Sequence, residues 1–124
     1  MMIVHSLSLL VGLGAVTQSS HLDERVVPAA FQGEWNERVE DCGTGNNDSR
    51  LRISASDVRF YESGGRVRGA FLHGPYELII VLDMSGEGQT WMASHHFILA
   101  SDGSYLSGKS DDGSLFTRYR CPTG

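Results

Sequence analysis

Histidines are the side chains of this sequence best suited to acid/base or metal chemistry near neutral pH. His95 and His96 are neighbours. Because successive residues of a strand point to opposite faces, these two cannot easily bind one metal ion. His73 and His95 could meet inside a barrel, but a third ligand would have to come from one of three glutamates, and nothing in the sequence selects one. We therefore expect core or rim histidines, and neither a metal nor a cofactor.

The segment 103–110, GSYLSGKS, has the letters of a phosphate-binding P-loop, G-x4-G-K-S. A P-loop needs a helix that begins at its Lys-Ser pair, so that backbone N–H groups and the helix dipole face the phosphate. Here Asp111, Asp112 and Gly113 follow. The two carboxylates would repel phosphate and the glycine would break the helix. The segment is interpreted as a hairpin strand with a loop after it, and no nucleotide site is expected.

No other group of residues specifies a reaction, so we expect a protein that is not an enzyme. The sequence lacks the G-x-S-x-G and H-E-x-x-H motifs of hydrolases. Four residues are candidates for binding: His95, Tyr76 and Trp91 in apolar segments, and Glu87, the single carboxylate of the polar, Gly-rich loop 85–90. The alternative for this loop is an ordinary hairpin turn with an exposed glutamate.

The first twenty residues predict export. Residues 1–20 contain no Asp, Glu, Lys or Arg, and an apolar run of about ten residues is followed by small residues, as in a signal peptide. A permanent membrane span needs roughly twenty apolar residues and is not expected. The leader lacks a basic residue at its start, so the alternative is a buried N-terminal segment. We expect a signal peptide at 1–20, a linker at 21–30, a barrel domain at 31–124, and a periplasmic or secreted protein.

Cys42 and Cys121 are the two cysteines, and their spacing matches no metal-binding motif. In an exported chain they predict one disulfide between the start of the domain and its last strand. Two buried free thiols in a cytosolic protein are the alternative.

Length and charge limit the remaining classes. The chain has 124 residues, 40% of them hydrophobic, and a net charge of -5. This size fits one domain, and an acidic chain has no basic surplus for binding nucleic acid.

The pattern of the domain predicts an all-β fold, a single up-and-down antiparallel β-barrel of about eight strands. Short apolar runs are separated by turns with Gly, Asn and Asp, and no long helical period is visible. The expected strands are Gly33–Val39, Leu51–Ser54, Val58–Glu62, Arg66–Leu72, Tyr76–Asp83, Thr90–Ala100, Tyr105–Gly108 and Leu115–Cys121. Turns are expected at 63–65, 74–75 and 102–103.

Alternation within two strands predicts which side chains point inward. These are Tyr76, Leu78, Ile80 and Leu82, and then Trp91, Ala93, His95, Phe97 and Leu99. Ile79 and Val81 are left on the outer face, where apolar residues are unusual. Either the N-terminal linker covers them or they form an interface, for example in a homodimer.

The opening Gly33-Glu34-Trp35, the meander of hairpins and the late arginines Arg118 and Arg120 together resemble the lipocalin-like (calycin) small exported β-barrels of bacteria, among them the periplasmic inhibitors of metalloproteases. In that group a basic residue of the last strand packs across the tryptophan. The resemblance implies that Trp35 plugs one barrel end, with Arg118 as its cation–π partner and Arg120 as the alternative. The chain is too short for the C-terminal helix of full lipocalins, which argues against a roomy cavity.

The function expected from these features is a non-enzymatic exported barrel that binds a small ligand or an envelope protein with its open mouth or a hairpin edge. A protein inhibitor of a periplasmic or extracellular hydrolase is the alternative. An enzyme that uses His95 in a small cavity is the third possibility. A filled barrel interior would exclude both a small ligand and an enzyme site inside the barrel, and would leave binding at the surface.

Overall fold

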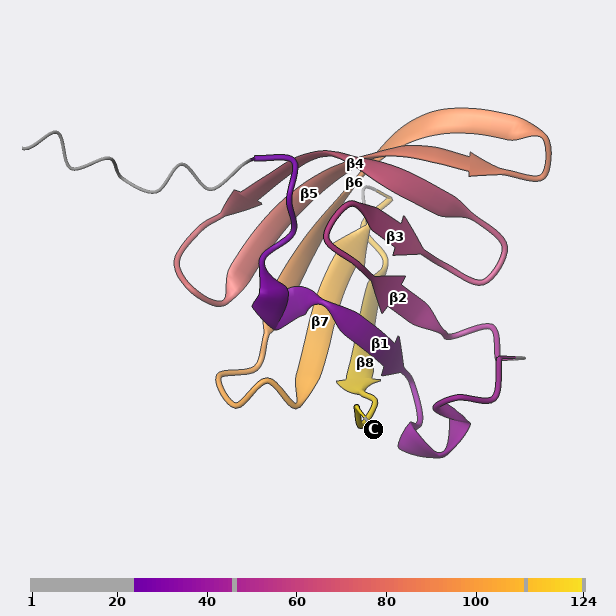
Figure 1. Ribbon diagram of the computed structural model, residues 1–124. Helices are drawn as coiled ribbons and strands as arrows, with labels where there is room; N and C mark the ends of the chain where they lie inside the picture. The colour runs from indigo at the N-terminus through magenta and orange to yellow at the C-terminus, as the bar shows by residue number, and fades with distance from the viewer. Residues whose placement is uncertain (1–23, 46, 111, 124) are drawn as a thin grey trace, which may run out of the picture.

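The computed structural model describes residues 24–45, 47–110 and 112–123, which form a closed antiparallel β-barrel (Figure 1). Its strands are β1 (Gly33–Asn36), β2 (Leu51–Ile53), β3 (Asp57–Arg59), β4 (Gly64–Leu72), β5 (Glu77–Gly86), β6 (Gln89–Leu99), β7 (Tyr105–Ser110) and β8 (Leu115–Arg120). Two short 3-10 turns, η1 (Ala29–Phe31) and η2 (Val39–Asp41), flank β1. Each strand pairs with the next and β8 returns to β1, so the predicted all-β, eight-stranded barrel is confirmed. The predicted leader, residues 1–20, lies outside the described residues.

Several strand ends differ from the expectation. β1 is shorter and ends at Asn36. The turn expected at 63–65 is wrong in part, because Gly64 and Gly65 both belong to β4. Gly65 allows close packing and does not make a turn, since a Cβ at this position would lie 2.6 Å from Sδ of Met84.

The β5–β6 hairpin is longer, and its turn tighter, than the sequence suggested. Residues 85 and 86 pair with 90 and 89, which reduces the polar loop to Glu87 and Gly88. Both have positive φ, 51° and 76°, as in a two-residue hairpin turn. Among the described residues, β6 pairs with β7 only from His95 onward, so the first half of β6 extends past the end of β7, while β5 stays paired with β4 as far as Ser85 (Figure 1).

The interior is filled by apolar side chains. The predicted inward rows are confirmed at Leu78, Ile80, Leu82, Ala93, His95, Phe97 and Leu99, all of them buried. Tyr76 and Trp91, expected in the same rows, are 45% and 42% exposed. Trp91 stays on the inner face of β6, opposite the buried Met84, but is not buried there. Tyr76 precedes β5, and Trp91 lies on the part of β6 that has no partner on its β7 side, so the opposite wall of the barrel covers neither.

The predicted linker contributes to the core. Val27 of the linker is fully buried, like Phe31 directly after it, and both belong to the same cluster as the strand residues. The backbone N–H of Val27 donates to the Ala55 carbonyl at 2.8 Å, and that of Ala70 in β4 donates to the Glu24 carbonyl. The described part of this segment, residues 24–30, leaves Ile79 on the outer face of β5 42% exposed.

Trp35 belongs to the barrel core and lies beneath Arg120 of the last strand. Its ring is fully buried, and its Nε1 donates to the Phe31 carbonyl at 3.1 Å. Arg120 lies over the ring, with 4.1 Å between its guanidinium carbon and the ring centroid. Arg118, the residue expected first for this contact, instead donates from Nε to the Ser49 carbonyl at 2.8 Å. The register explains the difference, because Arg120 is directly opposite Trp35 in the β1–β8 pair.

Trp35→Ala should lower the free energy of unfolding by about 3–5 kcal/mol, the usual cost of emptying a buried aromatic site. Urea unfolding measures the loss. Trp91→Ala is the matched control and should cost far less, because that ring is 42% exposed. Equal losses in the two variants would contradict the assignment of Trp35 as the plug.

Candidate functional site

The predicted disulfide between Cys42 and Cys121 is confirmed. It links the loop after β1 to the residue that follows β8, across a sequence separation of 79 residues. Asn36 is fully buried beside it, and its Nδ2 lies 3.0 Å from Sγ of Cys121. The disulfide therefore fixes the end of the barrel seam at which β1 and β8 meet.

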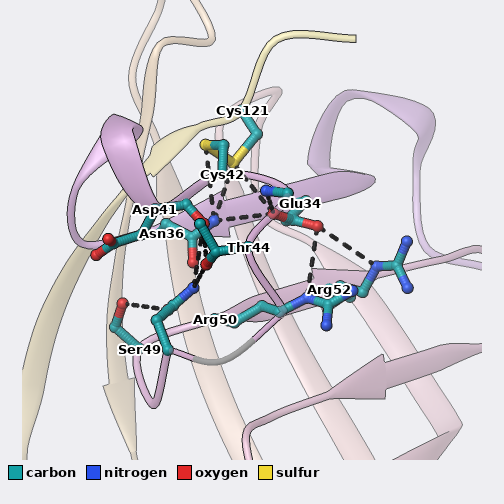
Figure 2. Close-up of polar contacts among 11 residues, drawn as sticks. Glu34, Asn36, Asp41, Cys42, Thr44, Ser49, Arg50, Arg52 and Cys121 are labelled. Carbon is teal, nitrogen blue, oxygen red and sulfur yellow. Dashed lines mark hydrogen bonds and ion pairs between the residues drawn. A yellow bond between two sulfur atoms is a disulfide. The ribbon is translucent and has the colours of Figure 1, made fainter. Parts of the chain in front are cut away.

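Glu34 connects this seam to two arginines (Figure 2). Its Oε2 accepts hydrogen bonds of 3.0 Å from the backbone N–H of Gly43 and from Nδ2 of Asn36. Its Oε1 lies 3.4 Å from Nε of Arg50 and 3.8 Å from Nε of Arg52. One carboxylate thus positions two guanidinium groups on the outer wall of the barrel.

These contacts keep Glu34 ionised. The hydrogen bond from the Gly43 N–H lowers the pKa of its carboxyl group most, and burial partly opposes that shift. Asn36, Arg50 and Arg52 lower the pKa further. The carboxylate is therefore a permanent negative charge beneath the two arginines at neutral pH.

The register of the short strands extends this group into a row of outward residues. Glu34 is opposite Arg52, Arg52 is opposite Arg59, and Arg59 is opposite Gly64. Arg59 lies across the bare backbone of Gly64, since a Cβ at this position would be 3.2 Å from its Nη1. Like charges directly opposite one another destabilise a sheet. The Arg52–Arg59 pair therefore concentrates positive charge on β2 and β3.

A hollow of about 420 Å³ opens beside this row. It lies between the loop before β2, the β3–β4 turn and the end of β5. Its lining residues are Gly45, Asn47, Arg50, Arg52, Arg59, Phe60, Tyr61, Glu62, Ser63, Gly64 and Ser85. A second hollow, of about 380 Å³, lies beside Arg52 and Arg59 where β1, β2 and β3 meet. The hollows thus place arginine, hydroxyl and amide groups around open space.

Glu87 follows the end of β5 and is not among the residues that line the larger hollow. Its carboxyl group shares a hydrogen bond with that of Glu62, and this contact and the negative charge of Glu87 raise the pKa of Glu62. The tip of the β5–β6 hairpin packs closely here, because a Cβ on Gly86 would lie 2.8 Å from the Glu62 carbonyl oxygen. None of the four predicted binding residues lines this hollow, and Glu87 is linked to it through Glu62.

The other three predicted binding residues lie apart. His95 is buried in the wall, with its ring centroid 5.1 Å from that of Phe60 and 5.8 Å from that of Phe97. Trp91 is on the projecting hairpin, and Tyr76 precedes β5 at the opposite end of that strand from Glu87. The four residues do not form one site.

One group in the described part of the chain has the composition of a metal site: Glu34, Cys42 and Cys121. The two sulfur atoms are bonded to each other, so the thiolates that a metal would need are absent from this oxidised protein. Within the described residues, no helix has the length and apolar character needed to cross a membrane.

Comparison with known proteins gives one similarity. The chain is 29% identical over 94 residues to a protein of Mycobacterium tuberculosis (strain CDC 1551 / Oshkosh) named "Uncharacterized protein MT1568". The match covers 71% of this chain and 29% of that protein, so the chain spans under a third of its relative's length. No protein-family profile and no solved structure matches the chain.

The sequence analysis did not single out Arg50, Arg52 or Arg59. A signal existed, since five of the ten Lys and Arg residues lie between positions 50 and 68 of an acidic chain. The spacing of Arg50 and Arg52 also places them on one face of a strand. That Arg59 lies opposite Arg52 depends on the register of the β2–β3 hairpin, which the residue pattern does not specify.

Glu34→Gln should be less stable than the wild type at pH 7 by about 1–3 kcal/mol, the range for a lost charge-assisted hydrogen bond. Because the folded state lowers the pKa of Glu34, its contribution is present above the ordinary pKa of 4.5 and is lost as the pH falls through the folded value. The variant should therefore lose less stability on acidification, as measured by urea unfolding at several pH values. Glu40→Gln, which alters an exposed glutamate, is the control. An unchanged acid profile in Glu34→Gln would contradict this role.

Removing the disulfide in the Cys42→Ser, Cys121→Ser double variant should cost about 4 kcal/mol, because the closed loop is long. The far-ultraviolet circular dichroism spectrum should stay that of a β-barrel. Thermal melting with and without reductant gives an independent measurement on the wild type. A melting temperature unaffected by reduction would show that the seam does not depend on the bond.

Proposed function

We propose that this protein is an exported, non-enzymatic β-barrel that binds a small ligand on its outer wall. The observation that carries the proposal is the hollow of about 420 Å³ beside β2 and β3. Binding sites typically combine a concave surface with a few polar groups that fix the orientation of the ligand. Here such groups converge from the loop before β2, from two strands and from a hairpin turn.

The packing of the interior favours the outer wall over the open mouth. Trp35 and Phe31 are fully buried in the core, and Phe60 and Phe116 pack against it. A hollow of only about 160 Å³ opens between Phe60, Phe116 and Arg118. The hollow on the outer wall therefore offers a ligand more space than this smaller opening does.

The surroundings of His95 argue against the enzyme alternative. Its side chain is buried between aromatic rings and lines none of the three hollows described above. A general acid or base must come within hydrogen-bond reach of a substrate. The position of His95 is better suited to packing.

Export rests on the predicted leader, and the disulfide is compatible with it. Disulfides persist in the periplasm and outside the cell, and they are rare in a reducing cytosol. The Cys42–Cys121 bond therefore supports a periplasmic or extracellular location.

The projecting β5–β6 hairpin favours a second candidate, the inhibitor of a hydrolase. Trp91 and Met92 are 42% and 56% exposed on a segment that pairs only with β5. Such a strand can insert into or pair with a partner protein. The homodimer predicted through Ile79 and Val81 stays a prediction, with Ile79 exposed and Val81 half-buried.

The test is a nuclear magnetic resonance screen of ¹⁵N-labelled protein recovered from the periplasm of a bacterial host. Neutral and charged small molecules should shift the amide signals of the residues that line the larger hollow. Ser63→Tyr, which fills the hollow, should abolish the shifts, whereas Ser114→Tyr on an exposed loop should not. Retention in the cytosol, or shifts centred on Trp91 and Met92, would contradict the proposal.

A further inference from the structure

We propose that the larger hollow binds the phosphate group of a small phosphomonoester, held by Arg50, Arg52 and Arg59. This inference rests on the proposed binding role of the hollow and names its ligand class. All three arginines line the hollow, and they come from the loop before β2, from β2 and from β3. Because guanidinium groups are planar forks of donors, they match the oxygens of phosphate.

The charge balance of the row favours an anion. Among the described residues, one carboxylate, that of Glu34, lies within ion-pair distance of these guanidinium groups, at Arg50 and Arg52. The three guanidinium groups outnumber this carboxylate, while Glu62, which also lines the hollow, and its neighbour Glu87 add negative charge at the β3–β4 turn. The excess of positive charge therefore lies at the arginine row, where a phosphomonoester could be held by charge. The surplus occurs in a chain whose net charge is -5.

The arginines of the neighbouring strand β4 show that this excess of positive charge is confined to the arginine row. Arg66 of β4 is flanked in the register by Asp57 and Asp83. Arg68 forms an ion pair with the same Asp83 at 3.3 Å. The outer wall therefore balances these arginines with aspartates, whereas the register places Arg59 between Arg52 and Gly64. A bound anion would balance this remaining charge.

The donors are held in place before a ligand arrives. Glu34, itself fixed by Gly43 and Asn36, orients Arg50 and Arg52. The Nε of Arg50 is buried and faces Oε1 of Glu34 at 3.4 Å. Arg59 extends over the bare backbone of Gly64, which leaves room for its side chain. Donors oriented in advance lower the entropic cost of binding.

The other residues that line the hollow indicate the chemistry of the part of the ligand beyond its phosphate group. The hydroxyl groups of Tyr61, Ser63 and Ser85 suit an uncharged polar body, and the volume leaves space beyond a phosphate group. The carboxyl group of Glu62 is directed to Glu87 by their shared hydrogen bond. A second negative charge on the ligand near this turn would be repelled, so the ligand carries its charge at one end.

The experiment titrates the full, oxidised protein with phenyl phosphate at constant ionic strength, followed by isothermal calorimetry and ¹⁵N amide shifts. Benzyl alcohol is the uncharged comparison. Saturable binding should shift the amides of residues 50, 52 and 59. Arg59→Gln should weaken binding about tenfold to a hundredfold, because it removes charge-assisted donors. The matched control Arg66→Gln removes the same charge outside the hollow and should leave affinity unchanged, whereas Glu62→Gln should tighten binding.

Several outcomes would overturn the inference. Equal weakening by Arg59→Gln and Arg66→Gln would indicate unspecific attraction of anions. Binding only to phosphatidylcholine vesicles that contain phosphatidic acid, without binding of free phenyl phosphate, would assign the phosphate to a lipid headgroup and reject the small-molecule ligand. If neutral compounds shift the amide signals of the residues that line the hollow and phenyl phosphate does not, the proposed ligand class is wrong and the proposed binding role stands. If no compound shifts these amide signals, both the binding role and the ligand class are wrong.

Discussion

Closure of the barrel through a four-residue strand is the constraint on which the rest of the structure depends. β1 pairs with β8 at only two positions, Trp35 with Arg120 and Asn36 with Tyr119. So short a ladder supplies little stability by itself, since pairs of cross-strand side chains are the unit that stabilises a sheet. The buried ring of Trp35 and the disulfide at Cys121 both act at this seam. Packing and covalent linkage there compensate for the few backbone hydrogen bonds.

Successive side chains of β1 point to opposite faces, and this places the candidate site beside the barrel seam. Trp35 points into the barrel, and its neighbour Glu34 must therefore point outward. The outward carboxylate reaches Arg50 and Arg52, and the loop held by the disulfide supplies the Gly43 N–H that keeps it ionised. The short strand β1 thus buries Trp35 in the core and orients the surface arginines through Glu34. Damage to the seam would displace both groups together.

Sequence analysis succeeded where a residue pattern alone determines the outcome. The long apolar alternation of β5 and β6 identifies their inward rows, because only one face of each strand can be buried. It failed at Trp91, where the neighbouring strand ends and burial depends on tertiary structure. It also could not choose between Arg118 and Arg120, which both lie on the inner face of β8, because register and not periodicity decides which one meets Trp35. The row of Arg50, Arg52 and Arg59 was not predicted because it also depends on the strand register.

The position of the arginine row relates binding to folding. β2 and β3 have three residues each and are the shortest strands of the described barrel. Their pair places Arg52 against Arg59, so the weakest part of the sheet also carries like-charge repulsion. An anion bound between these guanidinium groups would remove the repulsion in the folded state alone, and a ligand that binds only the folded state stabilises it in proportion to the logarithm of its concentration. The proposed affinity for an anion and the stability of the β2–β3 hairpin are therefore linked, because the charges that weaken the empty hairpin are the same charges that would hold the anion.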